Sequence, residues 1–323
     1  MTRTARRRWS REFSGEIDGI ALGDHGPVFL HGYDPPAGGK WIDDVIPGKL
    51  VAYDRHSGDE LWRSPCEVGY GRGFGSGLGE EDDVVVLGPC VSGHRIARMS
   101  RSTGELIGAR EIEPFDQALV FGDTSITVAS HRVNGIATSP MIEVWTHAVD
   151  GERYHIAGRS GASVLVTYTD LNRRTQGVHR LDVASGDYAG PFLEADLPVI
   201  HDLSCDDHLA VLLLGSRPLR AGGPEALTVA AFGTEGGGEA RPLWQRVVAN
   251  DSIDELPDVS ILVDSGKLYV TRGAILEVWD GLSARPLGEL TLPGLDERVA
   301  WSVRQGAALL AEETRASIFE LPA

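Results

Sequence analysis

A strand–turn–strand unit at residues 48–62 recurs along the chain and constrains the fold more than any other feature. Apolar residues alternate with period two up to Tyr53, an acidic turn runs from Asp54 to Gly58, and a second strand returns through Trp62. Aspartate at the start of a turn and glycine where φ must be positive are the residues that such a turn requires. Weaker copies follow along the whole chain, which indicates an array of repeats rather than a single core.

The repeats can be aligned on seven residues, each of which ends an apolar strand that we take as the third of its unit. The first three lie 46 residues apart, and the later spacings are 36, 51, 47 and 40 residues. Two strands precede each anchor and one follows it, and four strands in about 45 residues is typical of a β-propeller blade. The anchors are Tyr53, Met99, Trp145, Leu181, Phe232, Trp279 and Phe319.

The sequence therefore predicts an all-β, seven-bladed β-propeller of four-stranded antiparallel blades, with residues 1–323 forming a single domain. The last blade has only three strands before Ala323, whereas residues 8–13 form a spare strand at the other end. We expect this N-terminal strand to complete the seventh blade and close the ring, because closure removes an exposed sheet edge. The spacing of 36 residues at blade four leaves two alternatives, a stunted blade or misplaced boundaries.

Composition limits the partners and the compartment. A net charge of −17 disfavours nucleic acid and acidic membranes, and no apolar run is long enough to span a bilayer. The basic residues 3–8 precede a charged segment rather than the apolar region of an export signal, so we expect a cytoplasmic protein. We also expect a monomer. The three cysteines lie far apart without a C-x-x-C pair, so we expect neither a disulfide nor a metal site.

Four residues of the first repeat, Ala52, Asp54, Gly58 and Trp62, match the tryptophan-docking motif Ala-x-Asp-x-x-x-Gly-x-x-x-Trp. The chain thereby resembles the quinoprotein-like propellers, which include pyrroloquinoline quinone (PQQ) dehydrogenases and outer-membrane assembly lipoproteins. The resemblance implies outer tryptophans wedged between adjacent blades. Those proteins are exported and typically have eight blades, and many that oxidise alcohols carry an adjacent cysteine pair, which is missing here. We therefore expect the fold without PQQ, and no cofactor.

Propeller function usually lies in loops on one face, where first strands begin and second strands end. Blade four carries two arginines, Arg173 and Arg174, in a loop on this face. Planar guanidinium groups suit carboxylates or phosphates, so one interpretation is a funnel for a small anionic molecule or peptide. The alternative is that each arginine pairs with a nearby acid, such as Asp116, Asp202, Asp258 or Glu297, and holds blades together. Five blades place an arginine on this face: Arg72, Arg132, Arg217, Arg272 and Arg298.

The same face carries candidates for acid–base chemistry. Histidine is the side chain that most readily exchanges a proton at neutral pH, although propeller histidines are also often structural. The catalytic candidates are His31, His131, His201 and Asp202. Tyr33 is near His31 in sequence and Trp301 is near Arg298, and both are further candidates for ligand binding. Asp116, Asp258 and Trp41 in the long 34–47 loop are also candidates.

Two other patterns have structural interpretations. The alternating glycines of residues 69–79 match no nucleotide-binding pattern, and they suit an inner strand that approaches the crowded axis or leaves room for a ligand. The acids of residues 80–83 and 206–208 fall at turns, where we expect solvated side chains rather than a calcium site.

Three functional hypotheses remain. The first is a propeller that binds a small anionic molecule or peptide in its central funnel. The second is a metal-independent lyase, hydrolase or cyclase that uses a His or Asp base, with arginines stabilising negative charge in the same funnel. The third is a protein–protein scaffold that acts through its rim, although its loops are mostly polar or glycine-rich. The fold alone does not choose among them.

Overall fold

The computed structural model describes most of the chain as β-strands that belong to two compact units. Unit 1 comprises Met1–Thr4 and His147–Asp296, and unit 2 comprises Ala5–Thr146 and Glu297–Ala323. The expectation that residues 1–323 form a single domain is not tested by this division and stays a prediction. The described residues are 3–23, 25–35, 47–69, 75–79, 82–90, 92–173, 175–195, 199–215, 224–235, 240–252, 259–298 and 300–321.

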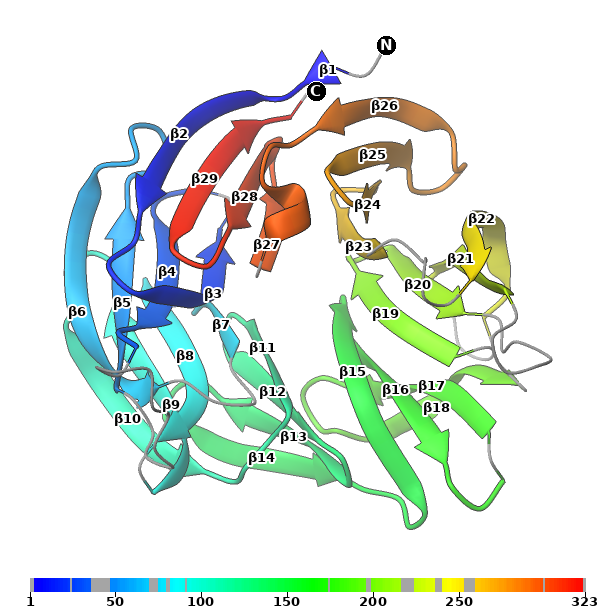
Figure 1. Ribbon diagram of the computed structural model, residues 1–323. Helices are drawn as coiled ribbons and strands as arrows, with labels where there is room; N and C mark the ends of the chain where they lie inside the picture. The colour runs from blue at the N-terminus through cyan, green and yellow to red at the C-terminus, as the bar shows by residue number, and fades with distance from the viewer. Residues whose placement is uncertain are drawn as a thin grey trace. The chain divides into compact units, whose positions relative to one another are not determined.

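Unit 2 contains four four-stranded sheets, which are blades one, two, three and seven (Figure 1). Blade one consists of β3 (Glu16–Leu22), β4 (Val28–Tyr33), β5 (Pro47–Tyr53) and β6 (Glu60–Gly69). Blade two consists of β7 (Gly75–Leu78), β8 (Asp83–Cys90), β9 (Gly93–Ser100) and β10 (Leu106–Ile112). Blade three consists of β11 (Gln117–Phe121), β12 (Thr124–Ala129), β13 (Arg132–Ala137) and β14 (Ile142–His147). Blade seven consists of β27 (Ala300–Arg304), β28 (Ala307–Ala311), β29 (Arg315–Glu320) and β2 (Arg6–Glu12).

Unit 1 contains blades four, five and six. Blade four consists of β15 (Glu152–Ser160), β16 (Ser163–Asp170), β17 (Thr175–Asp182) and β18 (Tyr188–Ala195). Blade five consists of β19 (Val199–Cys205), β20 (Leu209–Gly215), β21 (Pro224–Gly233) and β22 (Pro242–Ser252). Blade six consists of β23 (Val259–Asp264), β24 (Lys267–Arg272), β25 (Ile275–Asp280) and β26 (Pro286–Thr291), and the short β1 (Arg3–Thr4) pairs in parallel with β26.

The predicted fold class, an all-β seven-bladed propeller of four-stranded antiparallel blades, is confirmed. β2 pairs antiparallel with β29, so the N-terminal strand completes blade seven as predicted, and Figure 1 shows the two strands side by side. A 3₁₀ turn, η1 (Leu295–Glu297), is the one helical element among the described residues. Within that part of the chain, no helix has the length and apolar character needed to cross a membrane.

Blades are buried on both faces because alternate residues of a strand point to opposite sides. In β5, Leu50 and Ala52 join a core cluster with residues of blade two, whereas Val51 and Tyr53 join another with blade seven. All four side chains are 3% exposed or less. The middle strands are therefore apolar at nearly every position. In a sheet with one face in solvent, apolar and polar residues would alternate.

Three tryptophans on outer strands make the wedge contact between neighbouring blades that the motif implies. The indole Nε1–H groups of Trp62, Trp9 and Trp244 donate to the carbonyls of Arg101 (2.9 Å), Arg55 (3.0 Å) and Gly281 (2.8 Å). Each acceptor lies in the turn after the third strand of the next blade. At Gly58, where φ is +72°, a Cβ would come within 2.7 Å of the Trp9 ring, so this turn requires glycine for its conformation and for the contact.

In blade three, the residue used to align the repeats lies on a different strand from the one predicted. Trp145, taken above as the end of a third strand, lies on the fourth strand β14, and the third strand β13 ends at Ala137. The turn between them contains Pro140 and Met141 in place of the Asp-to-Gly turn, which removes the signal that marks third strands elsewhere. Blade four consequently has four complete strands of eight or nine residues, so the short spacing arose from misplaced boundaries.

The alternating glycines allow a close approach between two inner strands of unit 2. A Cβ on Gly75 would lie 2.6 Å from the Ala118 Cβ, and one on Gly77 would lie 2.5 Å from the Val120 Cβ. Ala118 and Val120 belong to β11, the inner strand of blade three. The glycines of β7 are therefore explained by packing against the neighbouring inner strand.

One expectation about the acidic turns is wrong. Asp83 is 1% exposed rather than solvated, and its carboxylate pairs with the buried guanidinium of Arg98 on the adjacent strand. Two charges taken out of water together are tolerated because they compensate each other. Asp206 behaves as a turn acid and accepts hydrogen bonds from the amides of His208 (3.0 Å), Leu209 (2.9 Å) and Gly266 (2.8 Å).

Candidate functional site

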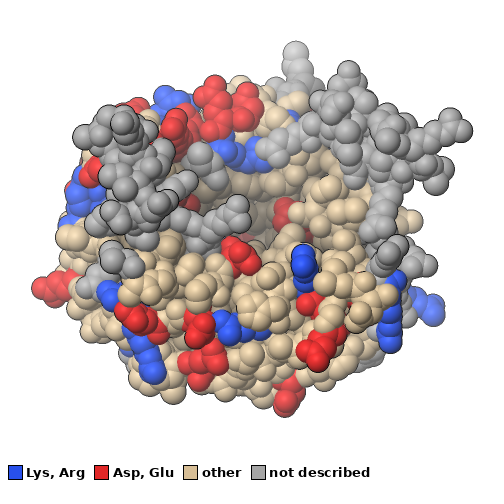
Figure 2. Space-filling view, turned by 60° about the horizontal axis from the view of Figure 1, so that its bottom comes forward, with Lys and Arg blue, Asp and Glu red and all other residues tan. Residues whose placement is uncertain are grey.

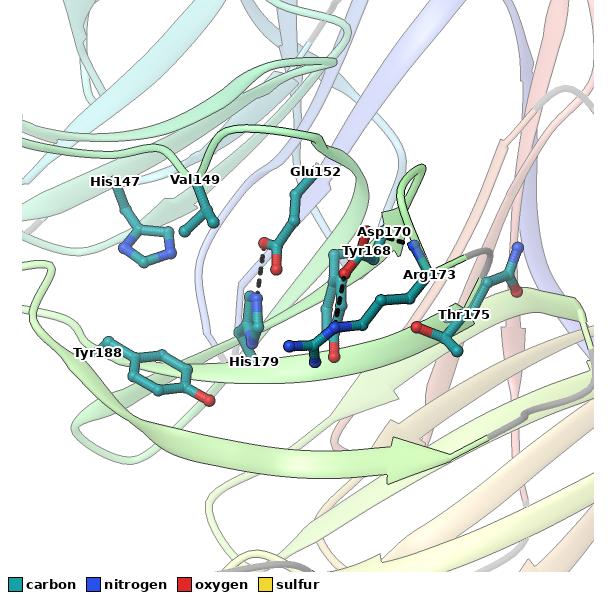
Figure 3. A pocket seen from close by; sticks show the side chains of 10 residues that line it. His147, Val149, Glu152, Tyr168, Asp170, Arg173, Thr175, His179 and Tyr188 are labelled. Atoms are coloured by element: carbon teal, nitrogen blue, oxygen red, sulfur yellow. Dashed lines mark hydrogen bonds and ion pairs between the residues drawn. The ribbon is translucent and has the colours of Figure 1, made fainter.

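A cavity in unit 1 lies at one end of blade four and has a volume of about 600 Å³ (Figure 3). Its size falls within the range of ordinary small-molecule sites. Every strand of blade four contributes to it, together with the segment that precedes β15. The lining residues are His147, Val149, Glu152, Tyr168, Asp170, Arg173, Thr175, Gln176, His179 and Tyr188.

Strand register brings the polar side chains to one face of blade four. Glu152 on β15 lies opposite Asp170 on β16, and Asp170 in turn lies opposite Thr175 on β17. One step further along the same face, Tyr168 lies opposite Gly177. Residues directly opposite one another in a sheet point to the same side, so three strands place their side chains in one row.

Gly177 makes room for the aromatic part of the site. A Cβ at this position would lie 2.7 Å from the ring and the hydroxyl of Tyr168 and 2.6 Å from the carbonyl oxygen of Leu193. Without a side chain there, the Tyr168 ring lies across β17 and stacks on His179, with centroids 3.8 Å apart and planes 8° from parallel.

His179 is the central buried group of the pocket. Its side chain is 7% exposed, and its Nε2 lies 2.8 Å from the Oε2 atom of Glu152, whose side chain is 11% exposed. The Tyr154 hydroxyl donates to the same oxygen at 3.1 Å. Burial and the nearby Glu152 raise the pKa of Tyr154, so its hydroxyl keeps the proton that it donates. Nδ1 of His179 is buried and has no hydrogen-bond partner among the described residues.

His147 and Tyr188 form the more open side of the cavity. Their rings are nearly parallel, with centroids 6.3 Å apart, and both lie edge-on to His179 at 6.0 and 5.0 Å. Burial, followed by the nearby His179, lowers the pKa of His147 despite the opposing effect of Glu152, so this ring is neutral at pH 7. The half-exposed Tyr188 ring presents aromatic surface to the solvent side.

Asp170 and Arg173 form the polar rim. Asp170 Oδ1 accepts the amides of Asn172 (2.8 Å) and Arg173 (3.0 Å) and so shapes the turn after β16. Its Oδ2 lies 3.6 Å from Nε of Arg173, whose side chain is 78% exposed. The rim therefore contains a matched pair of opposite charges, one of them largely in water.

Among the histidines predicted as catalytic, His31 has a structural position. It is 1% exposed on β4, with Nδ1 2.5 Å from Asp18 Oδ1 and Nε2 3.1 Å from the carbonyl oxygen of Val68. Both partners accept hydrogen bonds, so the two ring nitrogens both carry protons and the ring is charged. Burial alone lowers its pKa, but hydrogen bonds with Asp18 and Cys66 outweigh burial and raise the pKa to about 10.

The other predicted acid–base residues have varied environments. His131 is exposed in the turn between β12 and β13, and the exposed His201 lies on β19. Asp202 accepts hydrogen bonds from the amides of Leu203 (2.8 Å) and Ile261 (3.2 Å), and so links blade five to blade six. Burial raises the pKa of Asp202, and these two amide hydrogen bonds oppose that rise.

The predicted ligand-binding residues are arranged as local groups. Tyr33 is buried beside His31 and donates to Glu16 Oε2 at 2.5 Å. Asp116 is exposed at the end of blade three that also carries His131 and Arg132. Arg298 and Trp301 are half-buried before and within β27. The predicted meeting of these groups in one funnel stays a prediction.

Two of the five arginines have resolved acidic partners within or next to their own blade. Arg132 donates to Glu113 at 3.0 Å, and Arg272 pairs with Glu277 on the adjacent strand. These contacts match the alternative in which arginines pair with acids, although the partners are not the acids named from the sequence. Five residues named from the sequence lie outside the described residues: Trp41, Arg72, Arg174, Arg217 and Asp258.

Glu152, His179 and Tyr188 are pocket residues that sequence reasoning missed. The sequence feature that could have identified the pocket is the pairing of Tyr168 with Gly177, an aromatic residue opposite a glycine on adjacent strands. That signal depends on the correct register in blade four, which the misassigned Trp145 obscured. Within the described part of the chain, no group of three or more His, Cys, Asp or Glu side chains is arranged to hold a metal ion.

Comparisons with known proteins bear on the fold. No family model matches the chain, and no curated protein matches it. A solved structure, the crystal structure of BamB from Moraxella catarrhalis, aligns with a TM-score of 0.57 over 98% of this chain and 100% of that chain. The fold is similar to that of BamB. The two sequences are 13% identical, so the likeness shows the fold alone.

Proposed function

We propose that this propeller binds a small molecule in the blade-four pocket. The observation that carries the proposal is the His179 ring, which is buried against Tyr168 and held by Glu152, while its Nδ1 has no partner among the described residues. An unsatisfied polar atom in a protein interior costs about 1–3 kcal/mol, and this one belongs to a ring that lines a cavity. The surrounding aromatic and polar side chains match the usual composition of ligand pockets.

Binding is favoured over catalysis by the position of the ring nitrogens of His179. Nε2 is occupied by Glu152, and Nδ1 is buried. A general base must come within hydrogen-bond reach of the substrate proton, and neither nitrogen offers an exposed lone pair. The carboxylate-oriented imidazole is therefore better suited to shaping a pocket than to transferring protons.

The blade-four pocket is a better candidate than the arginine funnel. Arg132 and Arg272 direct their charges to Glu113 and Glu277, which reduces what they offer to an anionic ligand. We also infer kinship with the quinoprotein-like propellers, supported by the three tryptophan contacts between blades and by the likeness to BamB.

A thermal-shift screen against a metabolite library tests the proposal. Tyr188→Ala removes an aromatic wall of the pocket, and Leu243→Ala is a matched control because the two side chains are 49% and 51% exposed. We expect at least one compound to raise the Tm of the wild type and Leu243→Ala by about 2–5 °C, with no rise in Tyr188→Ala. Equal stabilisation of all three proteins by every active compound, or no active compound, would contradict the proposal.

A further inference from the structure

The geometry points to a ligand with a protonated amine, whose ammonium group pairs with the free oxygen of Glu152 against the aromatic walls. This inference rests on the proposed function and names the chemical class of the ligand. Both donors to Glu152, the Tyr154 hydroxyl and the His179 Nε2–H, reach Oε2. Oε1 has no donor within the described part of the chain, although a carboxylate accepts at both oxygens.

Glu152 is the one pocket carboxylate with unused capacity. Asp170 Oδ1 accepts two turn amides, and its Oδ2 faces the guanidinium of Arg173. Glu152, in contrast, is nearly buried, and its side-chain partners among the described residues are the neutral Tyr154 and the imidazole of His179. Electrostatic attraction is stronger in such a partly enclosed place than at the rim, where water screens charges.

The walls of the cavity also suit a cation. Tyr168, Tyr188 and His147 present aromatic rings, and an ammonium group near the face of a ring gains about 0.5–2 kcal/mol. The neutral state of His147 at pH 7 leaves this wall without a repelling charge. A cavity of about 600 Å³ accommodates an amine attached to a ring or a short chain.

Arg173 is the group that opposes this inference. Its guanidinium faces the cavity in Figure 3, but the side chain is 78% exposed and Nε lies 3.6 Å from Asp170. Its charge is therefore balanced locally and screened. The chain as a whole carries a net charge of −17, which attracts cations rather than anions. Figure 2 shows basic and acidic side chains interspersed on the visible face, with no large basic patch among the described residues.

Three probes with one phenyl ring and different charges test the inference: benzylamine (cationic at pH 7), benzyl alcohol (neutral) and benzoate (anionic). We expect benzylamine to bind with a Kd on the order of millimolar, at least 5-fold tighter than benzyl alcohol, as measured by ligand-observed NMR titration. Glu152→Gln keeps the shape of the side chain and removes its charge, and it should weaken benzylamine at least 5-fold without changing benzyl alcohol. Glu143→Gln, an exposed glutamate on β14, is the control.

Each result separates the ligand class from the proposed function. Benzoate as the tightest probe, or equal benzylamine affinity in wild type and Glu152→Gln, overturns the amine inference. If the probes that bind the wild type bind Tyr188→Ala with lower affinity, the pocket remains a ligand site and only the predicted class of ligand is wrong. No binding of any probe at about 20 mM also overturns the inference, whereas the library screen decides the proposed function. Should Glu152→Gln fail to fold, Tyr188→Phe must retain benzylamine binding and Tyr188→Leu must lose it.

Discussion

Blades one and four both contain a histidine held by a carboxylate, but the two pairs differ in what surrounds the ring. His31 has an acceptor on each nitrogen, Asp18 and the carbonyl of Val68, and its side chain is fully enclosed. His179 has Glu152 on one nitrogen and, within the part of the chain that the structure describes, no hydrogen-bond partner on the other; its side chain borders a cavity. The first pair has an acceptor for each ring nitrogen, whereas the second leaves Nδ1 without one among the described residues. Residue type alone therefore does not show whether a histidine is fully hydrogen-bonded in the interior or borders a cavity.

The largest expected effect comes from removing the acid of the completed pair. Asp18→Ala leaves the buried His31 ring without its counter-charge, and we expect a loss of about 3–5 kcal/mol in the free energy of unfolding. Glu152→Ala should cost less, about 1–2 kcal/mol, because water can enter the pocket and reach His179. Urea denaturation at pH 7 measures both. An equal loss in the two variants would remove the distinction between the pairs.

Each pair is flanked by a glycine, which gives a second comparison. A Cβ on Gly48 would lie 2.3 Å from the Val68 carbonyl oxygen and 2.4 Å from Nε2 of the enclosed His31, so Gly48→Ala should cost about 3 kcal/mol. A Cβ on Gly177 would meet Tyr168, which has a cavity to move into, so Gly177→Ala should cost about 1 kcal/mol. The same denaturation series tests the order, and a larger loss for Gly177→Ala would contradict it.

The charged state of His31 predicts a pH dependence on the alkaline side. The folded protein holds this proton up to about pH 10, whereas an ordinary histidine releases it near 6.5. The contribution of this group to stability is therefore complete below pH 6.5 and is lost as the pH rises towards 10. We expect the free energy of unfolding to fall by about 3 kcal/mol between pH 7 and 9.5. Asp18→Asn should flatten that slope and Glu152→Gln should keep it; a flat wild-type profile would refute the charged ring.

His147 predicts the smallest effect, with the opposite sign. Its pKa is lowered in the folded state, so its contribution to stability is present above about 6.5 and is lost as the pH falls below that value. The ring is half-exposed and solvent screening reduces the effect, so we expect a loss of less than about 0.5 kcal/mol between pH 6.5 and 5. The acid limb of the stability profile should be shallower in His147→Phe than in the wild type, and an unchanged limb would count against the lowered pKa.

Much of the fold was predictable because the repeated turns carry a local signal. An aspartate that accepts the amides of the next residues, with a glycine shortly after, is readable in sequence and recurs at Asp54 and Asp182. The same signal is missing between β13 and β14, where the turn uses Pro140 and Met141 instead. The predicted strand boundaries of blade four were therefore wrong, and the pocket, which depends on the register of those strands, was not predicted.

The amino-acid sequence by itself determined the class of the fold, the number of blades and the completion of blade seven by the N-terminal strand. These features follow from period-two patterns and turn residues, which act over a few neighbouring positions. Only the tertiary structure decided that both nitrogens of His31 have acceptors and that no described residue is a hydrogen-bond partner of His179 Nδ1. Such a distinction depends on atoms brought together from several strands, and burial and hydrogen-bond geometry of that kind leave no local mark in the chain.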